Sequence, residues 1–263
     1  MLRTPSRPRR ARAGFTLIEL LIVIAIIGIL AGLMAGGINY VQNSAKRNTC
    51  LNNLRQWGGA LTQYLAEHKD KFPTYDGSDL KSETAWFNAL PPYLEKSLNT
   101  STYRDLAANG RSIPHPGDGS QSLFLCPVDG GESGKWESDA TEHAANLGYY
   151  SSYTMNTWVK NAANKPPLTE RLRRSQLQSA SAFVVMTETC HGSVGGANPA
   201  SNLYDPETGA TAFRHNQAIN LLFADGHSAS FPKGTVWDAE MSAEDNRGGL
   251  QWNPNRGVDN QPL

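Results

Sequence analysis

The sequence has little charge, few cysteines and none of the short motifs that mark several common enzyme classes. Charged residues make up 18% of the 263 positions, and there are three cysteines. A phosphate-binding glycine loop, a Gly-x-Ser-x-Gly turn and a His-Glu-x-x-His helix are all missing from the sequence. No period of 20–50 residues recurs, so the sequence does not support a solenoid.

The overall charge is neutral, but its distribution is not. Lysine plus arginine and aspartate plus glutamate each number 24. Residues 1–14 hold five arginines and no acid, so the remainder carries 19 basic against 24 acidic residues. A nucleic-acid-binding domain needs a basic patch on its folded part, and this balance argues against nucleic acid as a partner.

One long apolar run follows the arginine-rich leader. Residues 15–38 read FTLIELLIVIAIIGILAGLMAGGI, with Glu19 as the single charge. A helix of this length rises about 36 Å, enough for a hydrocarbon core of about 30 Å. The positive-inside rule keeps the leader in the cytoplasm. The pattern predicts a single-pass membrane helix over residues 15–38, with the residues after Ile38 outside the cytoplasm.

The junction of leader and apolar run carries a resemblance. The leader, residues 1–14, ends in Gly14, and the apolar run begins at once with FTLIE at residues 15–19. This resembles the type IV prepilin signal of type IV pilins and type II secretion pseudopilins. The resemblance implies cleavage between Gly14 and Phe15 by a prepilin peptidase, then methylation of the Phe15 amine. The alternatives are a plain signal anchor and a secretory signal peptide with a weak cleavage site at Ala35 and Gly37.

Glu19 has two interpretations. A carboxylate within a bilayer helix costs about 2.5–3.5 kcal/mol at the centre and less near an interface. The simpler interpretation is a side chain that reaches the headgroups from the first helical turn. The interpretation that the family implies is a salt bridge to the free Phe15 amine of a neighbouring subunit, strong in low dielectric. We favour the second.

Residues 39–70 predict an amphipathic helix that continues the membrane helix. Its apolar positions fall within one arc of about 140° at 100° per residue. We expect Pro73 to close it. The glycine pair at 58–59 weakens the helix locally and permits a bend. The stripe consists of Cys50, Leu51, Leu54, Trp57, Gly58, Leu61, Tyr64 and Leu65.

From residue 71 to residue 247 the pattern changes to short apolar runs separated by turn residues. Strands are expected at 123–126, 149–155, 182–187, 218–223 and 227–231. A short helix is expected over 84–96, interrupted at Pro91 and Pro92. The tail 248–263 has few apolar residues, and we expect it to be loosely held. The predicted fold class is α+β: a long N-terminal helix packed on an antiparallel β-sheet domain, as in pilins.

The segment FRHNQAINLLFADGH places nine residues between His215 and the pair Asp225-Gly226. With the prepilin signal, this resembles the DUF1559-like group of bacterial prepilin-type proteins, which end in a His-nine-residues-Asp-Gly motif. CLNNLRQ at 50–56, CPVD at 126–129 and SYTMN at 152–156 also resemble that group, although Thr154 stands where the family has glycine. We expect Gly226 to occupy a turn position with positive φ.

Five acidic and histidine residues suggest a metal or catalytic site at first sight: Glu188, His191, His215, Asp225 and His227. A strand over 218–223 separates His215 from Asp225 by about 20 Å, too far for one ion unless the chain doubles back near residue 216. We therefore expect His215 to fix a loop through a hydrogen bond worth about 1 kcal/mol, and Asp225 to shape the turn. No catalytic residue and no metal ligand is assigned.

Cys50, Cys126 and Cys190 all lie in the part predicted to face an oxidising compartment, which indicates one disulfide and one remaining thiol. The pairing is open from sequence. We favour Cys50–Cys126, because one lies on the buried helix face and the other ends an expected core strand. No cofactor is expected. The segment DGSD at 76–79 with Glu83 offers oxygen atoms to calcium, but such turns are common and no ligands are assigned.

Together these features predict a non-enzymatic pseudopilin-like or pilin-like subunit of a type II secretion or type IV pilus-like filament. Its expected partners are the prepilin peptidase, other pilin-like subunits and an inner-membrane assembly platform. Its expected location is the bacterial inner membrane, with a cytoplasmic N-terminus and a periplasmic domain, or a filament. The alternatives are a membrane-anchored, metal-dependent periplasmic hydrolase and a minor pilin that binds a surface substrate through loops within 108–146.

The leader predicts the effect of a substitution at the cleavage position. Gly14→Leu should leave the leader attached, because the peptidase accepts only a small residue before the cut. Mass spectrometry of the membrane fraction measures this directly. A mature chain that begins at Phe15 in the Gly14→Leu variant would contradict the prediction.

Overall fold

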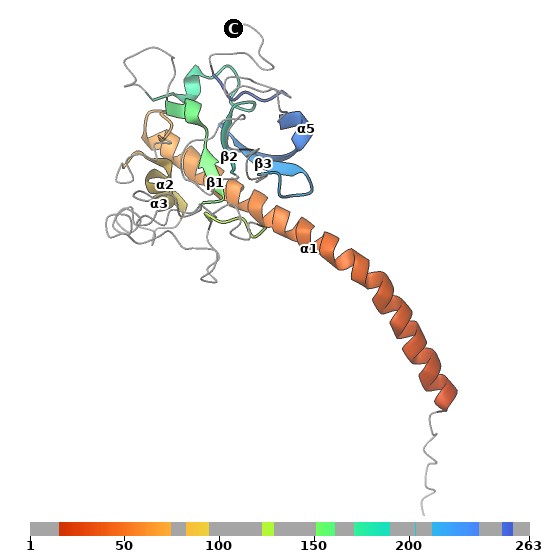
Figure 1. Ribbon diagram of the computed structural model, residues 1–263. Helices are drawn as coiled ribbons and strands as arrows, with labels where there is room; N and C mark the ends of the chain where they lie inside the picture. The colour runs from red at the N-terminus through yellow and green to blue at the C-terminus, as the bar shows by residue number, and fades with distance from the viewer. Residues whose placement is uncertain are drawn as a thin grey trace, which may run out of the picture. The chain divides into compact units, whose positions relative to one another are not determined.

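The structure is a computed structural model that describes residues 16–74, 83–94, 123–128, 151–160, 171–189, 203, 212–236 and 249–254 (Figure 1). The chain divides into two compact units, Met1–Asn43 and Ser44–Leu263. The first contains the start of the long helix α1, Leu17–Glu67, and the second contains its remaining turns and a β-sheet.

Helix α1 begins with a capping box. The Thr16 backbone N–H and hydroxyl both donate to Glu19 Oε2 at 2.8 Å, and the Glu19 N–H donates back to the Thr16 hydroxyl at 3.3 Å. Such reciprocal bonds satisfy N–H groups that have no partner inside the helix. Glu19 thus has a local role at the helix start that sequence reasoning did not anticipate.

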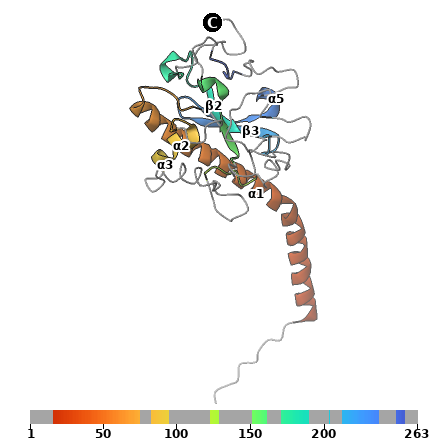
Figure 2. The same cartoon turned by 60° about the vertical axis from the view of Figure 1, so that its left-hand side comes forward.

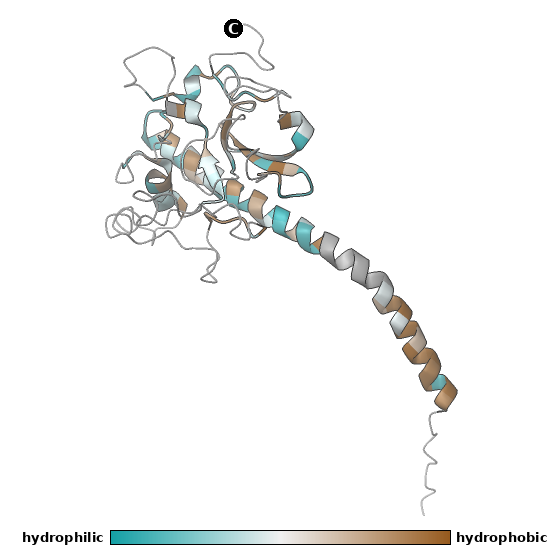
Figure 3. Cartoon of the chain, in the orientation of Figure 1, coloured by the Kyte–Doolittle hydropathy of each residue, from teal (hydrophilic) through white to brown (hydrophobic). Residues whose placement is uncertain are grey.

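Within the first unit, the described apolar side chains of residues 17–32 are exposed. Figure 3 shows the first turns of α1 coloured almost wholly as hydrophobic. Large apolar side chains between Leu17 and Leu30 are 44–81% exposed. Within the described part of the chain, no helix combines the length and apolar character needed to cross a membrane. The membrane span of residues 15–38 therefore stays a prediction.

The later turns of α1 bury the predicted stripe in the second unit. Every member is buried except Leu51, which is partly exposed. Trp57 makes edge-to-face contacts with Trp86 at 5.4 Å and with Phe124 at 4.9 Å between ring centroids. These rings form the centre of the larger hydrophobic core, so this face of the helix is part of the domain.

Four antiparallel strands form the sheet in the order β1-β2-β3-β4. They are β1 Tyr153–Met155, β2 Val184–Glu188, β3 Ala218–Phe223 and β4 Ser228–Pro232. In Figures 1 and 2 the last turns of α1 pass beside β1. The predicted α+β class, an N-terminal helix with an antiparallel sheet, is confirmed.

Both faces of β3 are buried. Ile219, Leu221 and Phe223 belong to one apolar cluster, whereas Leu222 belongs to the cluster that contains the α1 stripe. Alternate residues of a strand point to opposite faces, so the two clusters cover the two sides of the sheet. This explains the uninterrupted burial of a strand that would alternate if one face met water.

Short helices complete the described elements: α2 Trp86–Ala89, α3 Pro91–Leu94, the 3-10 helices Thr157–Lys160 and Arg174–Gln176, and α5 Lys233–Val236. Pro91 starts α3, where its missing N–H would have no helical partner anyway. Tyr93 donates to Glu67 at 2.6 Å and so ties α3 to α1. Burial, followed by this bond to the carboxylate, raises the pKa of Tyr93 to about 12.

The expected strand at 123–126 is wrong. This segment is a turn whose backbone groups bond mainly to side chains, although the Phe124 carbonyl also accepts from the Ser152 N–H at 2.8 Å. The carbonyls of Leu123 and Leu125 accept from Trp57 Nε1 and Asn53 Nδ2, both at 3.1 Å. The Cys126 N–H donates to the Ser152 hydroxyl at 2.9 Å. These bonds replace those of a β-ladder, and Pro127 offers no N–H to extend one.

The expected loose tail is also wrong for its first part. Leu250 is 3% exposed and Trp252 is fully buried. The Gln251 N–H donates to the carbonyl of Ala182 at 2.8 Å, and its carbonyl accepts from the Val184 N–H at 2.9 Å. The tail has few apolar residues, but two of them, Leu250 and Trp252, are large and buried. The folded domain therefore includes residues 249–254 rather than ending at residue 247.

Two glycines bring helix α1 against the β3–β4 turn. A Cβ at Gly58 would collide with the carbonyl oxygen of Gly226 and lie 2.8 Å from Leu222 Cδ1. Gly226 has φ +92°, and a Cβ there would lie 2.9 Å from Thr62 Oγ1. The positive φ expected at Gly226 is present. Gly58 permits this close approach, and the local bend suggested by the glycine pair at 58–59 stays a prediction.

The contrast between Gly58 and its neighbour gives a matched test. Gly58→Ala should destabilise residues 44–263, because overpacking costs about 1–3 kcal/mol and outweighs a helix-propensity gain of about 1 kcal/mol. Gly59 is exposed, and a Cβ at this position would have no neighbour within 4 Å. Gly59→Ala should therefore stabilise the domain by about 0.5–1 kcal/mol. Urea unfolding measures both, and equal effects of the two substitutions would refute the glycine contact.

Candidate functional site

A buried pair of ionisable side chains lies at one end of the sheet. Glu188 ends β2, and His215 lies three residues before β3. Asn216 and Gln217 both have positive φ, 56° and 60°. His215 and Ala218 exchange backbone hydrogen bonds across them, at 3.3 and 3.2 Å. This tight turn carries the His215 side chain back to Glu188.

Hydrogen bonds occupy both oxygens of the Glu188 carboxyl group. Oε1 lies 2.8 Å from His215 Nε2 and accepts from Asn220 Nδ2 at 3.3 Å, and Oε2 accepts from the Asn220 N–H at 2.9 Å. Both side chains of the Glu188–His215 pair are 0% exposed. Burying a carboxyl group is costly unless such partners are present. Within the described residues, His215 Nδ1 has no hydrogen-bond partner, so Nε2 makes the polar contacts of the ring.

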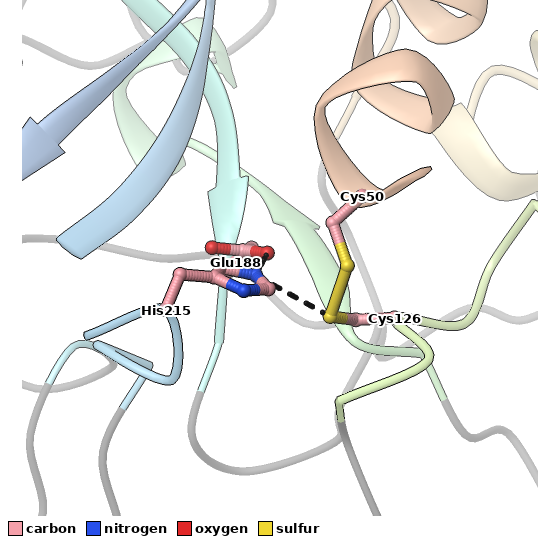
Figure 4. A group of neighbouring side chains, drawn as sticks. All are labelled: Cys50, Cys126, Glu188 and His215. Atoms are coloured by element: carbon pink, nitrogen blue, oxygen red, sulfur yellow. Dashed lines mark hydrogen bonds and ion pairs between the residues drawn. A yellow bond between two sulfur atoms is a disulfide. The ribbon is translucent and has the colours of Figure 1, made fainter. Parts of the chain in front are cut away.

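The pair adjoins a disulfide between Cys50 on α1 and Cys126 (Figure 4). The Cα atoms of the two cysteines are 5.2 Å apart, and this is the pairing that the sequence favoured. His215 Nε2 lies 3.5 Å from Cys126 Sγ. The disulfide and the Glu188–His215 pair together connect α1, the 123–128 turn, β2 and the turn before β3.

Four potential metal ligands meet at this point. One ligand atom each from Cys50, Cys126, Glu188 and His215 lies within 4.8 Å of the others, and all four residues are buried. With the cysteines joined, the two sulfurs are not thiolates and do not provide the anionic ligands of a zinc site. In this oxidised form the arrangement is a packed cross-link between elements.

Arg214 strengthens the same region. Its Nη1 donates to the Thr189 carbonyl at 2.8 Å, and its Nη2 donates to the Ser152 carbonyl at 3.3 Å. The Thr189 N–H in turn donates to the Ser152 carbonyl at 3.0 Å. The residue beside His215 thus joins the ends of β1 and β2 through backbone carbonyls.

Asp225 and His227 form a separate, exposed pair. Asp225 Oδ1 accepts from the His227 N–H at 3.1 Å and lies 2.6 Å from His227 Nδ1. The Asp225 N–H donates to the carbonyl of Ala180, which precedes β2, whereas Glu188 ends that strand. His215 and Asp225 therefore lie at opposite ends of β3. His215 bonds to Glu188 beside the turn that precedes β3, and Asp225 bonds to His227 in the turn that follows β3. A purely structural role for the two residues stays a prediction.

Glu188 is the hydrogen-bond partner of His215. The sequence marked both residues as candidates but did not pair them. The pairing could have been predicted from the glutamate at the end of an apolar strand, because a buried glutamate needs a partner. Several other positions of interest lie outside the described residues: Gly14, Phe15, Cys190, His191 and the DGSD segment at 76–79. Glu83 is described and exposed.

Comparisons with known proteins give two family matches. Residues 9–35 match the Prokaryotic N-terminal methylation motif. Residues 41–171 match the family described as Protein of unknown function (DUF1559). No curated protein and no solved structure matches the chain.

The buried pair predicts a large effect of removing its histidine. His215→Ala should destabilise residues 44–263 by about 3 kcal/mol or more, because it strips a buried carboxyl group of a partner. That exceeds the effect of one ordinary hydrogen bond, and it corresponds to a melting temperature about 6–12 °C lower. His227→Ala, which breaks the exposed pair, should cost no more than about 1 kcal/mol. Thermal unfolding that ranks the two variants equally would contradict the proposed importance of burial.

Proposed function

We propose that this chain, which belongs to the DUF1559 family and carries the prokaryotic N-terminal methylation motif, is a structural, pilin-like subunit of a bacterial filament. The observation that carries the proposal is the motif over residues 9–35, which covers the end of the arginine-rich leader, the Gly14–Phe15 junction and the apolar start of α1. The filament is of the type II secretion or type IV pilus class.

The exposed first turns of α1 support membrane anchoring before assembly. Their large apolar side chains are 44–81% exposed, as in Leu17, Ile24 and Ile29. A contiguous apolar surface of this kind marks a membrane or protein interface rather than a water-facing surface. Residues 15–38 lie in the inner membrane in the free subunit. In a filament, apolar surfaces of neighbouring subunits replace the lipid.

Processing sets the free end of this helix. Prepilin peptidase cuts between Gly14 and Phe15 on the cytoplasmic side, and the new Phe15 amine is methylated. The leader's arginines stay in the cytoplasm before the cut. An inner-membrane assembly platform then receives the subunit, and the domain from Ser44 onwards faces the periplasm.

Glu19 has a part in both states of the subunit. In the free subunit its carboxylate accepts from the Thr16 N–H and hydroxyl, both at 2.8 Å. In the filament it pairs with the Phe15 amine of a neighbour, where low dielectric strengthens the attraction. The gain of an opposite charge favours assembly in one axial register, because displaced subunits would leave the carboxylate unpaired.

The buried site supports a structural role rather than hydrolysis. Glu188 and His215 are fully buried, and hydrogen bonds occupy both carboxyl oxygens. A catalytic base must reach a substrate proton directly or through one water. The minor-pilin alternative depends on loops at 108–120 and 129–146, which lie outside the described residues.

Substitution at Glu19 tests the proposed assembly contact. Glu19→Ala should leave cleavage after Gly14 largely intact but strongly reduce incorporation into filaments, because the amine of the neighbour loses its counter-charge. Thr16→Ala is the matched control, since it removes the capping hydroxyl but keeps the carboxylate, and it should assemble nearly normally. Immunoblotting of sheared filaments and of membranes separates assembly from processing. Normal filament yield in Glu19→Ala would reject the salt bridge, and impaired yield in Thr16→Ala alone would assign Glu19 to capping.

A further inference from the structure

We propose that the reduced form of this domain binds one Zn²⁺ through Cys50, Cys126, His215 and Glu188. This site goes beyond the proposed filament role and does not depend on it. The oxidised form, with the Cys50–Cys126 bond closed, does not bind the ion. The two forms together make a zinc site that opens and closes with the redox state of its cysteines.

The spacing of the four side chains suits a tetrahedral ion. Zinc bonds of about 2.3 Å to sulfur and about 2.0–2.2 Å to nitrogen or oxygen place ligand atoms about 3.3–3.8 Å apart. His215 Nε2 already lies 3.5 Å from Cys126 Sγ, and all four ligand atoms lie within 4.8 Å of one another. Separation of the sulfurs and a shift of about 0.5 Å between His215 Nε2 and Glu188 Oε1 complete the geometry.

The types of donor also suit zinc. The donor set consists of two thiolates, one imidazole nitrogen and one carboxylate oxygen. Such a set binds the borderline-soft zinc ion in preference to calcium or magnesium. Two thiolates and a carboxylate would be strongly unfavourable together in a buried, uncompensated cluster. The charge of the ion offsets that repulsion, so reduction itself creates the affinity.

Contacts independent of the disulfide keep the two cysteines close after reduction. Asn53 and Trp57, on the same helix as Cys50, donate to the carbonyls of residues 125 and 123 at 3.1 Å. The Cys126 N–H is bonded to Ser152 Oγ at 2.9 Å. Asn220 holds the Glu188 carboxyl group through its backbone N–H at 2.9 Å. Such outer contacts orient ligands and raise metal affinity.

The exchange between the two forms balances. A dithiol reductant gives two electrons to the Cys50–Cys126 bond by thiol–disulfide exchange and itself becomes a disulfide. Zn²⁺ then binds the two protein thiolates, and two protons pass to solvent. In the reverse direction, a small disulfide takes two electrons from the bound thiolates and two protons from solvent, and leaves as two thiols. The protein disulfide re-forms, and Zn²⁺ is released.

The site would hold the newly made cysteines together until they are oxidised. Residues 50 and 126 are 76 positions apart in sequence, and Cys190 offers each of them a wrong partner. A zinc ion bound to the correct pair favours that pair and releases it only as the bond forms. The partner class implied is a disulfide donor.

The test compares one full-length protein in detergent in its two redox states. Metal-free samples, either oxidised or reduced with a phosphine, are titrated with Zn²⁺ and analysed for bound metal. The reduced protein should bind one equivalent and the oxidised protein none. Co²⁺ should give thiolate-to-metal absorption in the reduced protein alone. Equal binding by the two forms, or no binding by either, would overturn the proposal without reference to any variant.

Substitutions then test the ligand set. Cys126→Ser, His215→Gln and Glu188→Gln should each weaken Zn²⁺ binding by the reduced protein at least about tenfold. Cys190→Ser and His227→Gln are the matched controls for thiol and imidazole, and both should bind as the wild type does. Loss of binding in either control, or unchanged binding in a ligand variant, would overturn the assignment. Oxidised glutathione added to the zinc-loaded protein should release one equivalent, and retention of the ion would count against redox gating.

Discussion

The fully buried carboxyl group of Glu188 imposes the constraint on which the centre of the domain depends. Such a group is tolerated only when its oxygens have partners, and these come from His215 and Asn220. His215 reaches it only because residues 216–217 adopt a tight turn with positive φ. The same imidazole adjoins the disulfide that ties α1 to the 123–128 turn. One carboxyl group therefore links strand, turn and helix.

The Asp-Gly end of the motif has a different physical role. Gly226 brings the β3–β4 turn against Gly58 of α1, and Asp225 closes that turn through His227. The motif thus marks two attachments at the two ends of β3, one polar and buried, the other a close backbone contact. Both fix the sheet to the second half of α1.

Sequence could predict features governed by local chemistry. The bounds of β3, the positive φ at Gly226 and the buried stripe of α1 follow from alternation, turn preference and helical period. Other features depended on tertiary partners. The 123–126 segment became a turn because Trp57, Asn53 and Ser152 bond its backbone. Leu250 and Trp252 are buried because they pack in the apolar cluster that contains Ile219, Leu221 and Phe223 of β3. No local sequence pattern reveals such a contact.

The central functional claim is that this is a processed, pilin-like subunit, and intact-mass analysis of the protein from its native membrane tests it most directly. We expect a single chain that begins at N-methylated Phe15 and retains the rest of the helix, with Cys50 and Cys126 joined. A chain that keeps its leader, or one cut at the Ala35–Gly37 site as by signal peptidase, would contradict the claim, because neither chain would have a free Phe15 amine at the apolar end of α1.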